Sequence, residues 1–399
     1  MEPVHLKLEL AVHGARLDAA LAQRIGRGRG AGSSARPSLD VVLPGEVWVG
    51  VPIVDTPTPY VLAAEGDDTY LLRGDATGNA DLRIEVRIAT PPRFYERRTS
   101  RGTPMSTIAT VRAGHLVISP GAACGYSMNG APCRFCLEGA RVAVERDAAP
   151  IADVIEVVRA AFGEGVAEHV YFNTAVFDAE DGGIAFLAPY IEGVRRHFDT
   201  LVVTQIHPPR STAWIDRTYA MGVDALSYNL EIYDPTVLGR HCIGRARYIG
   251  RDRYLDALGY AAGVFPSGTV WSDLVIGLEP AQSTLAGIEA LAAKGVVPVA
   301  SIVRGEAPLP EPAEIIPVLA ELYRSVKRHG INMGWVRDLA LGITPLEARH
   351  FAGDGARLAV TVQHLTRFRL GALAARGLAR FRRRLRVRNV SESFDSAQL

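Results

Sequence analysis

Apolar and polar positions alternate in two different ways along this chain of 399 residues, and the change comes near Gly114. Before that residue, short segments with apolar side chains at every second position predict β-strands, because successive side chains of a strand point to opposite faces. These strands are expected at residues 39–43, 46–51, 68–73 and 81–88. We therefore expect a small β-rich accessory unit over residues 1–100.

From Gly114 onward, short and almost wholly apolar segments alternate with longer segments of helical period. Strands are expected at residues 115–119, 169–174, 199–206, 225–231, 269–277 and 296–303. Helices are expected at residues 150–162, 184–197, 211–221, 251–263, 281–294 and 311–329. Strands that are apolar on both faces are typical of a parallel sheet covered by helices. With right-handed crossovers, this α/β pattern predicts a partial (β/α)6 TIM-like barrel over residues 101–310.

Residues 311–399 are expected to form a helical and basic C-terminal extension, after a possible further strand at residues 331–336. Nine arginines lie between Arg367 and Arg388. Such a segment could dock RNA or a carrier protein. No aromatic stacking platform accompanies these charges, so we do not expect nucleic acid as a partner.

Composition narrows the class of protein. The formal net charge of +1 gives no electrostatic reason to expect nucleic acid or a membrane surface. No apolar segment is long enough to span a bilayer, and the first residues lack the charged and apolar regions of a signal peptide. The chain has only four cysteines, three of them close together, which is unlike a secreted disulfide framework. We expect a cytoplasmic protein that does not bind membranes.

Three of the four cysteines, Cys124, Cys133 and Cys136, lie in one loop rich in glycine and proline, directly after the first expected barrel strand. Active sites of such barrels lie at the carboxyl ends of the strands. Three thiolates can hold a metal centre and leave one coordination position open. The alternatives are inert thiols, or a non-catalytic scaffold with a structural zinc ion whose fourth ligand is a histidine or Cys242.

This loop resembles the cluster loop of the radical S-adenosylmethionine (SAM) superfamily, in which three cysteines bind a [4Fe–4S] cluster. The family's usual spacing is Cys-x3-Cys-x2-Cys, whereas this chain has Cys-x8-Cys-x2-Cys, with the aromatic Phe135 before the last cysteine as in the family. The longer first interval costs only about 0.9 kcal/mol in loop-closure entropy. Metal–thiolate binding contributes on the order of 10 kcal/mol, so the longer loop is compatible with a cluster.

The fourth expected barrel strand carries Ser227, Asn229 and Glu231 on one face, since side chains alternate along a strand. Three polar residues at alternating positions would be costly in a filled core, but they suit a cavity that holds a polar ligand. The pattern resembles the fourth strand of biotin and lipoyl synthases, where such residues approach SAM. The resemblance implies that Glu231 binds the ribose hydroxyls or the amino group.

The same resemblance implies further SAM contacts at the other strand ends. Asn173 and Thr174 occupy the place of the family's Gly-Gly-Glu-Pro segment, which binds the SAM amino group, with Asp178, Glu180 and Asp181 as anionic alternatives. An arginine at the start of the helix after the fourth strand would pair with the SAM carboxylate: Arg253, or Arg247 in reserve. Gly277 would let the fifth strand approach adenine closely.

The reaction implied by the resemblance is reductive cleavage of SAM to a 5′-deoxyadenosyl radical, with an electron from a flavodoxin- or ferredoxin-type donor. The radical would abstract hydrogen from a small molecule, a cofactor precursor or a natural-product precursor in a biosynthetic reaction. Sulfur insertion is not expected, because a second cluster needs about three more cysteines and only Cys242 remains. His207, Cys242 and Arg304 are the candidates for contact with the substrate.

Overall fold

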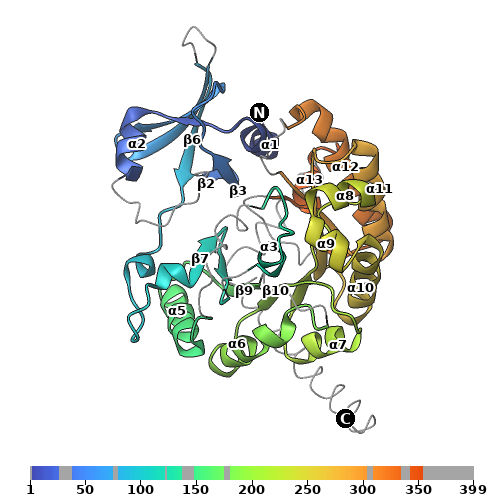
Figure 1. The fold of residues 1–399 in the computed structure, drawn as a ribbon. Coiled ribbons are helices and arrows are strands. Elements are labelled where there is room, and N and C mark those ends of the chain that lie inside the picture. Colours follow the sequence, from blue (N-terminus) through green and yellow to red (C-terminus); the bar gives the residue numbers. More distant parts are fainter. Residues whose placement is uncertain are drawn as a thin grey trace.

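The computed structural model describes residues 2–26, 38–74, 80–121, 124–136, 148–174, 180–302, 309–333 and 342–353. Within these ranges the strands form two sheets, one of eight strands and one of six. Figure 1 shows the larger sheet surrounded by a ring of helices, with the smaller sheet beside it.

The larger sheet contains six neighbouring parallel strands in chain order. They are β8 (His115–Ile118), β9 (His169–Asn173), β10 (Val202–Gln205), β11 (Ala225–Ser227), β12 (Val270–Val275) and β13 (Val297–Ser301). An antiparallel strand closes each edge: β7 (Ala109–Arg112) beside β8, and β14 (Gly342–Ile343) beside β13. The prediction of an α/β protein with a partial TIM-like barrel is confirmed.

Six long helices cover the outside of this barrel, at the positions expected from the sequence (Figure 1). They are α5 (Ile151–Gly163), α6 (Ile184–His197), α7 (Ala213–Ala220), α10 (Arg251–Val264), α11 (Ala281–Ala293) and α12 (Pro312–Arg328). Each turns an apolar face to the sheet; in α5 this face includes Val154, Val157, Val158 and Ala161. Two short helices, α8 (Pro235–His241) and α9 (Ile243–Tyr248), lie between β11 and α10 in the chain.

The two faces of the parallel strands differ in exposure. In β9, Val170 and Phe172 are fully buried in the core beneath the helices, whereas Tyr171 and Asn173 keep partial access to solvent. The same alternation occurs in β10 and over Val270–Leu274 of β12. Since side chains of a strand alternate between faces, the partly exposed residues line the inside of the barrel. The barrel interior is therefore accessible to solvent.

The smaller sheet contains the four strands expected in the N-terminal unit. They are β2 (Ser38–Leu43), β3 (Val47–Pro52), β5 (Asp68–Gly74) and β6 (Ala80–Ile88). The sequence pattern missed β1 (Arg16–Leu17) and β4 (Tyr60–Glu65), which pair with each other. It also missed α2 (Ala19–Gly26). The strand β4 runs Tyr-Val-Leu-Ala-Ala-Glu and lacks the period of two that marks a half-exposed strand.

The first helix, α1 (Pro3–His13), was not predicted because it is apolar on more than one side. Leu6 and Leu10 pack in the core of the smaller sheet, while Leu8 and Val12 pack in the core of the barrel. A helix buried on two sides has no single apolar stripe to recognise. Figure 1 shows α1 near α12 and α13 (Pro345–Ala348), in line with its contacts to α12. The division at residues 100 and 310 remains a prediction.

The strand expected at residues 331–336 is wrong in the part that the structure describes. Ile331 lies in the turn that ends α12, where its N–H donates to the carbonyl of Val326 at 3.1 Å. Gly330 has a φ of 63° and donates to Lys327 at 3.2 Å, which completes a Schellman motif with an apolar residue after the glycine. Ile331 is thus a helix-end signal. The arginine-rich segment, residues 367–388, lies outside the described residues.

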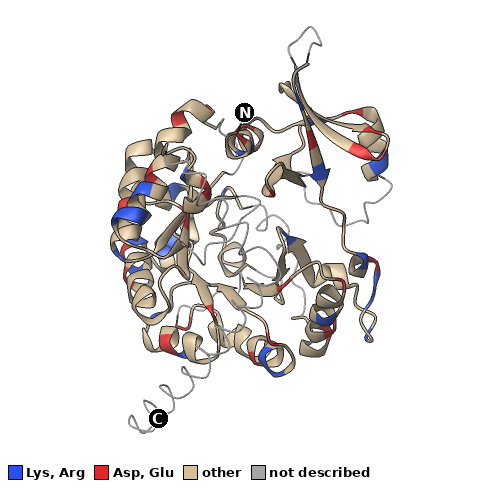
Figure 2. Cartoon of the chain, turned by 180° about the vertical axis from the view of Figure 1, so that it is seen from behind, with Lys and Arg blue, Asp and Glu red and all other residues tan. Residues whose placement is uncertain are grey.

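Acidic and basic residues are interspersed over the helices of the outer ring (Figure 2). Among the described residues, no helix is both long enough and apolar enough to cross a membrane.

Candidate active site

The cysteine loop follows β8 and is fixed against the junction of α8 and α9. The short helix α3 (Gly125–Met128) begins directly after Cys124, and Figure 1 shows it in the middle of the ring of helices. The N–H of Arg134 donates to the carbonyl of His241 at 2.9 Å, next to an antiparallel bridge between Cys133 and Cys242. The loop therefore lies at the carboxyl ends of the parallel strands.

Gly244 in α9 makes this close contact possible. Its N–H donates to the carbonyl of Ala131 at 3.0 Å. A Cβ atom at this position would lie 2.4 Å from the ring of Tyr126 and 2.7 Å from the carbonyl oxygen of Ala131. The loop and the helix thus pack at a distance that only glycine allows.

Cys124, Cys133 and Cys136 are all partly buried and all free of disulfides. The N–H of Cys136 donates to the carbonyl of Cys133 at 3.2 Å. In the described part of the chain, no three histidine, cysteine or acidic side chains converge as the ligands of a single metal ion do. Such convergence is what a tetrahedral zinc site requires. A cubane cluster instead takes each thiolate on a different iron, so its ligands are spread over a larger object.

The thiol of Cys133 has the electrostatic surroundings of a metal ligand. A hydrogen bond from the thiol of Cys242 lowers the pKa of Cys133, and the charge of Arg245 lowers it further against the opposing effect of burial. The thiolate is the form of cysteine that binds metal. The donor set in this loop therefore fits an iron–sulfur cluster.

Glu231 and Arg245 form a buried ion pair beside the loop, with 3.3 Å between Oε1 and Nη2. Glu231 has a φ of 70°, an unusual value for a residue other than glycine. Its backbone is bonded to β12: its N–H donates to the backbone carbonyl of Asp273, and its own carbonyl accepts from the N–H of Val275, both at 2.8 Å. Burial raises the pKa of Glu231, and Arg245 opposes that shift.

Ser227 and Asn229, predicted to share a face with Glu231, are buried and bonded to each other through Ser227 Oγ and Asn229 Oδ1. The carbonyl of Asn229 accepts a hydrogen bond from Arg245. Arg245 also donates to the hydroxyl of Tyr254 at 3.0 Å. Glu231 and Asn229 thus contact one guanidinium, and Ser227 supports Asn229. The strand β11 itself ends at Ser227, so the strand expected over residues 225–231 is shorter than predicted.

Sequence reasoning missed Arg245, although it named two nearby arginines. Arg253 donates to the backbone carbonyl of Pro209, and Arg247 lies over the ring of Tyr248. A signal for Arg245 was present, because it lies three residues after Cys242 and so on the same side of a helix. Of the three arginines, only Arg245 forms an ion pair with Glu231 among the described residues.

His207 and Cys242, both candidates for substrate contact, lie next to the cysteine loop. His207 Nδ1 is 3.3 Å from the hydroxyl of Tyr126, and the two rings pack edge to face. Burial lowers the pKa of His207 well below its usual value, with a smaller contribution from Arg245, so the imidazole is neutral near pH 7. Cys242 is fully buried against Cys133. Arg304 lies outside the described residues.

The other predicted SAM contacts are spread around the strand ends. Asn173 ends β9 on the inner face, and the N–H of Thr174 donates to Gln205 at 3.3 Å. Phe135 packs in a small cluster with Ile232, Leu238 and Cys242. Gly277 has a φ of 89°, and a Cβ atom there would lie 2.7 Å from Pro310.

The acidic alternatives near β9 have structural roles or fall outside the described residues. Asp181 accepts hydrogen bonds from the N–H groups of Gly183 and Ala185, at 2.6 and 3.3 Å, at the start of α6. Glu180 contributes its backbone carbonyl to a bond from Arg210. Asp178 is not among the described residues. The cofactor role of these three residues stays a prediction.

The inner face of the barrel carries a second polar group that the sequence did not suggest. Tyr171 donates to Gln205 Oε1 at 2.6 Å, and its ring centre lies 6.2 Å from that of Trp271. Ser301 Oγ donates to Asp273 Oδ2 at 3.0 Å. These residues alternate along their strands with more deeply buried neighbours, which was the one signal available in the sequence.

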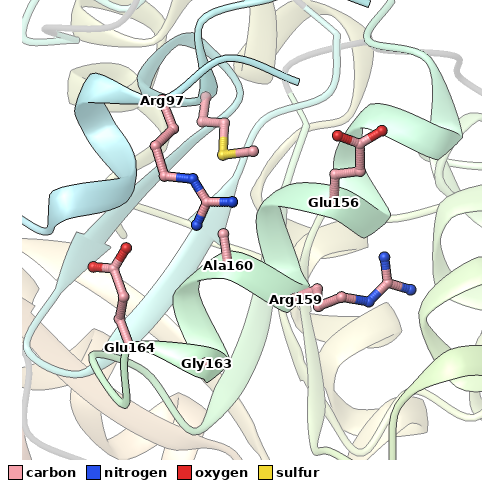
Figure 3. Close-up of a pocket in the computed structure, with 7 residues that line it drawn as sticks. Arg97, Glu156, Arg159, Ala160, Gly163 and Glu164 are labelled. Carbon is pink, nitrogen blue, oxygen red and sulfur yellow. The ribbon is translucent and has the colours of Figure 1, made fainter. Parts of the chain in front are cut away.

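A hollow of about 600 Å³ lies elsewhere, between α5 and the segment that carries Arg97 and Met105 (Figure 3). Its charged lining residues are of both signs: Arg97, Glu156, Arg159 and Glu164. Because α5 leads into β9, the last turn of this helix, at Gly163, lies at the amino ends of the strands. The hollow is therefore at the opposite end of the barrel from the cysteine loop.

Comparison with known proteins gives matches among solved structures alone. No family model matches the chain, and no curated protein matches it. The chain is similar to methylornithine synthase (PylB) at 14% identity and a TM-score of 0.42, over 60% of this chain and 81% of that one. The hydrogenase maturase HydG from Carboxydothermus hydrogenoformans gives 14% identity and a TM-score of 0.42, over 54% of this chain and 52% of that one.

A third structure, the cobalamin-dependent S-adenosylmethionine radical enzyme OxsB, gives 14% identity and a TM-score of 0.34, over 75% of this chain and 45% of that one. Likenesses at this level leave the function of the chain to be argued from its own residues.

Proposed function

We propose that this protein is a radical SAM enzyme whose [4Fe–4S] cluster is held by Cys124, Cys133 and Cys136. One observation carries the proposal: the loop with these thiols is fixed at the carboxyl ends of the barrel strands, beside the buried Glu231–Arg245 pair. Parallel α/β barrels hold their active sites at that end.

The surrounding residues suit a zwitterionic ligand such as SAM. Arg245 is a fixed cation that can pair with a carboxylate, and Glu231 is an anion that can accept hydrogen bonds from an ammonium or from ribose hydroxyls. The carbonyl of Asn229 accepts a hydrogen bond from the guanidinium, and Ser227 holds the Asn229 side chain. Asn173 and Thr174 lie at the end of β9, Gln205 ends β10, and Phe135 packs beside Cys242, all at this end of the barrel.

When bound, the cluster would supply the electron that cleaves SAM to methionine and a 5′-deoxyadenosyl radical. The residues of the chain position the ligand and exclude water. Tyr126 packs over Gly244 and against His207, so the cysteine loop covers the strand ends with aromatic surface. The neutral imidazole of His207 can donate or accept a hydrogen bond without adding charge.

The proposed substrate is a small molecule, a cofactor precursor or a natural-product precursor, and the electron donor is a flavodoxin or ferredoxin. A protein with metal-binding thiols and no disulfides suits a reducing compartment such as the cytoplasm. Sulfur insertion is not proposed, because Cys242 is the only cysteine outside the cluster loop.

Anaerobic reconstitution with iron and sulfide tests the ligand assignment. We expect Cys124→Ala, Cys133→Ala and Cys136→Ala each to abolish the SAM-dependent change in the electron paramagnetic resonance spectrum of the reduced cluster. The matched control is Cys242→Ser, which removes the one remaining thiol but keeps a hydrogen-bond donor beside Cys133, and it should keep that change. The proposed ligand set would be contradicted if the control lost the SAM-dependent spectral change while Cys124→Ala kept it.

A further inference from the structure

The inner face of the barrel carries an aromatic pair and a carboxylate close to the proposed SAM site. Tyr171 of β9, Trp271 of β12 and Asp273 of β12 alternate with fully buried residues that face the helices. All three keep partial access to solvent. They therefore face the inside of the barrel, where Trp271 also packs against the apolar cluster that includes Val297, Val299 and Ile331.

Asp273 is an anion without a counter-ion in the described part of the chain. Its Oδ2 atom accepts from Ser301, while its Oδ1 atom is enclosed and has no hydrogen-bond partner among the described residues. Burial raises the pKa of this carboxyl group. An enclosed carboxylate is costly unless a positive group compensates it.

Arg245, the cation whose charge acts on Asp273, already has other partners. Arg245 pairs with Glu231 at 3.3 Å and donates to Tyr254 at 3.0 Å and to the carbonyl of Asn229. Its charge acts on Asp273 only over a distance, since no ion pair joins the two. The Oδ1 atom of Asp273, which is enclosed, is thus left without a paired cation in the part of the chain that the structure describes.

The aromatic pair beside Asp273 has the chemistry of a cation site. The Tyr171 ring is held by its hydrogen bond to Gln205, and the Trp271 ring lies 6.2 Å away at an angle of 52°. Trp and Tyr rings attract organic cations through their electron-rich faces. Asp273 and Glu231 act electrostatically on the Tyr171 hydroxyl, so both carboxylates lie near this ring.

We propose that Tyr171, Trp271 and Asp273 bind the ammonium group of the substrate, so that the enzyme acts on a small primary amine. That the bound amine is a substrate rests on the proposed function. Binding of the ammonium group does not depend on the cluster. Asp273 forms the ion pair, and the two rings enclose the remaining faces of the cation. A neutral or anionic molecule of the same shape would leave the carboxylate uncompensated.

Saturation-transfer NMR titrations of the full chain with n-butylamine, 1-butanol and butyrate test this site. They are run on protein with and without a reconstituted cluster, in both cases without reductant. We expect the ammonium to bind about tenfold or more tighter than the other two, as an ion pair with aromatic contacts would give. Asp273→Asn should abolish that preference, and Trp271→Leu should weaken amine binding without creating a preference for butyrate. The matched control, Asp256→Asn, changes an exposed carboxylate on α10 and should bind the amine as the parent protein does.

Equal affinity for the three probes, or an unchanged preference in Asp273→Asn, would overturn the proposal. A fall in SAM affinity in Asp273→Asn would also overturn it, by assigning the carboxylate to SAM rather than to the substrate. If the chain bound no cluster, amine selectivity in the unreconstituted protein would persist, so failure of the proposed function and failure of this inference give different results.

Discussion

At the scale of single residues, the arrangement around Arg245 decides how SAM would be held. One guanidinium contacts Glu231, Tyr254 and the carbonyl of Asn229. The planar fork of arginine can pair with a carboxylate through two hydrogen bonds, which the single ammonium of lysine cannot reproduce. The identity of this cation should therefore matter more than its charge.

Arg245→Lys is expected to weaken SAM binding about tenfold to a hundredfold, since hydrogen bonds to charged groups contribute about 1.5–3 kcal/mol. Arg253→Lys is the matched control, because Arg253 is held by the carbonyl of Pro209. Isothermal titration with SAM under anaerobic conditions, on protein with equal iron content, measures both. Equal losses in the two variants would show that Arg245 has no special role.

Glu231→Gln is expected to weaken SAM binding by a similar factor and to leave the iron content unchanged. The amide keeps the size of the side chain but removes the negative charge that would attract an ammonium. Binding of SAM and iron content are measured on the same preparation. Unchanged affinity would remove Glu231 from the site.

The residues that sequence alone could identify are those whose signal is local. Cys124, Cys133 and Cys136 are close in the chain, and Ser227, Asn229 and Glu231 lie within five residues at the end of β11. Arg245, Tyr171, Trp271 and Asp273 belong to other elements, and their proximity depends on strand register and on how α9 packs. No pattern along the chain encodes that register.

At the scale of elements, the cysteine loop depends on its contact with α9. Its backbone bonds to His241 and Gly244 fix the loop before any cluster binds. Such preorganisation reduces the entropy lost when ligands gather around a metal centre.

Gly244→Ala is expected to displace the loop, because the new Cβ would overlap the Tyr126 ring and the Ala131 carbonyl. Overpacking of this kind costs about 1–3 kcal/mol. Gly239→Ala is the control. Gly239 lies on the neighbouring helix α8, and a Cβ atom there would meet nothing within 4 Å. The urea concentration at the unfolding midpoint and the iron content after reconstitution should both fall in Gly244→Ala alone. Equal midpoints and iron contents in the two variants would contradict the packing argument.

The barrel elements were predictable because their patterns agree with the final fold. Apolar strands and amphipathic helices alternate, and each expected barrel strand and helix is present. Two of the wrong or missing predictions outside the barrel strands have clear physical reasons. Ile331 is apolar because it closes the end of α12, and α1 is apolar on two sides because it lies between two cores.

At the scale of the whole molecule, α1 connects the smaller sheet to the barrel. Lys7 in α1 pairs with Glu347 in α13 at 2.6 Å, and both side chains are buried. Glu347 also completes a capping box with Thr344 at the start of α13. The two ends of the described chain are thus joined by one buried charge pair.

Lys7→Met is expected to destabilise the protein by about 3–5 kcal/mol, because it leaves the charge of Glu347 buried without a partner. The double variant Lys7→Met/Glu347→Gln should recover part of that loss, since glutamine is neutral and can still serve the capping box. Lys294→Met, in an exposed pair with Asp256 at 3.6 Å, should change stability by at most about 1 kcal/mol. Urea unfolding midpoints of the three variants measure these changes in stability. A double variant that is no more stable than Lys7→Met would contradict the role of the buried charge of Glu347.

The central claim is that the three thiols of the loop hold a cluster that cleaves SAM. The most direct measurement is the release of 5′-deoxyadenosine by the anaerobically reconstituted full chain, given SAM and dithionite. We predict release above that of SAM with dithionite alone, and its loss in Cys133→Ala. A protein that takes up only zinc, or that carries a cluster and releases no 5′-deoxyadenosine, would contradict the account.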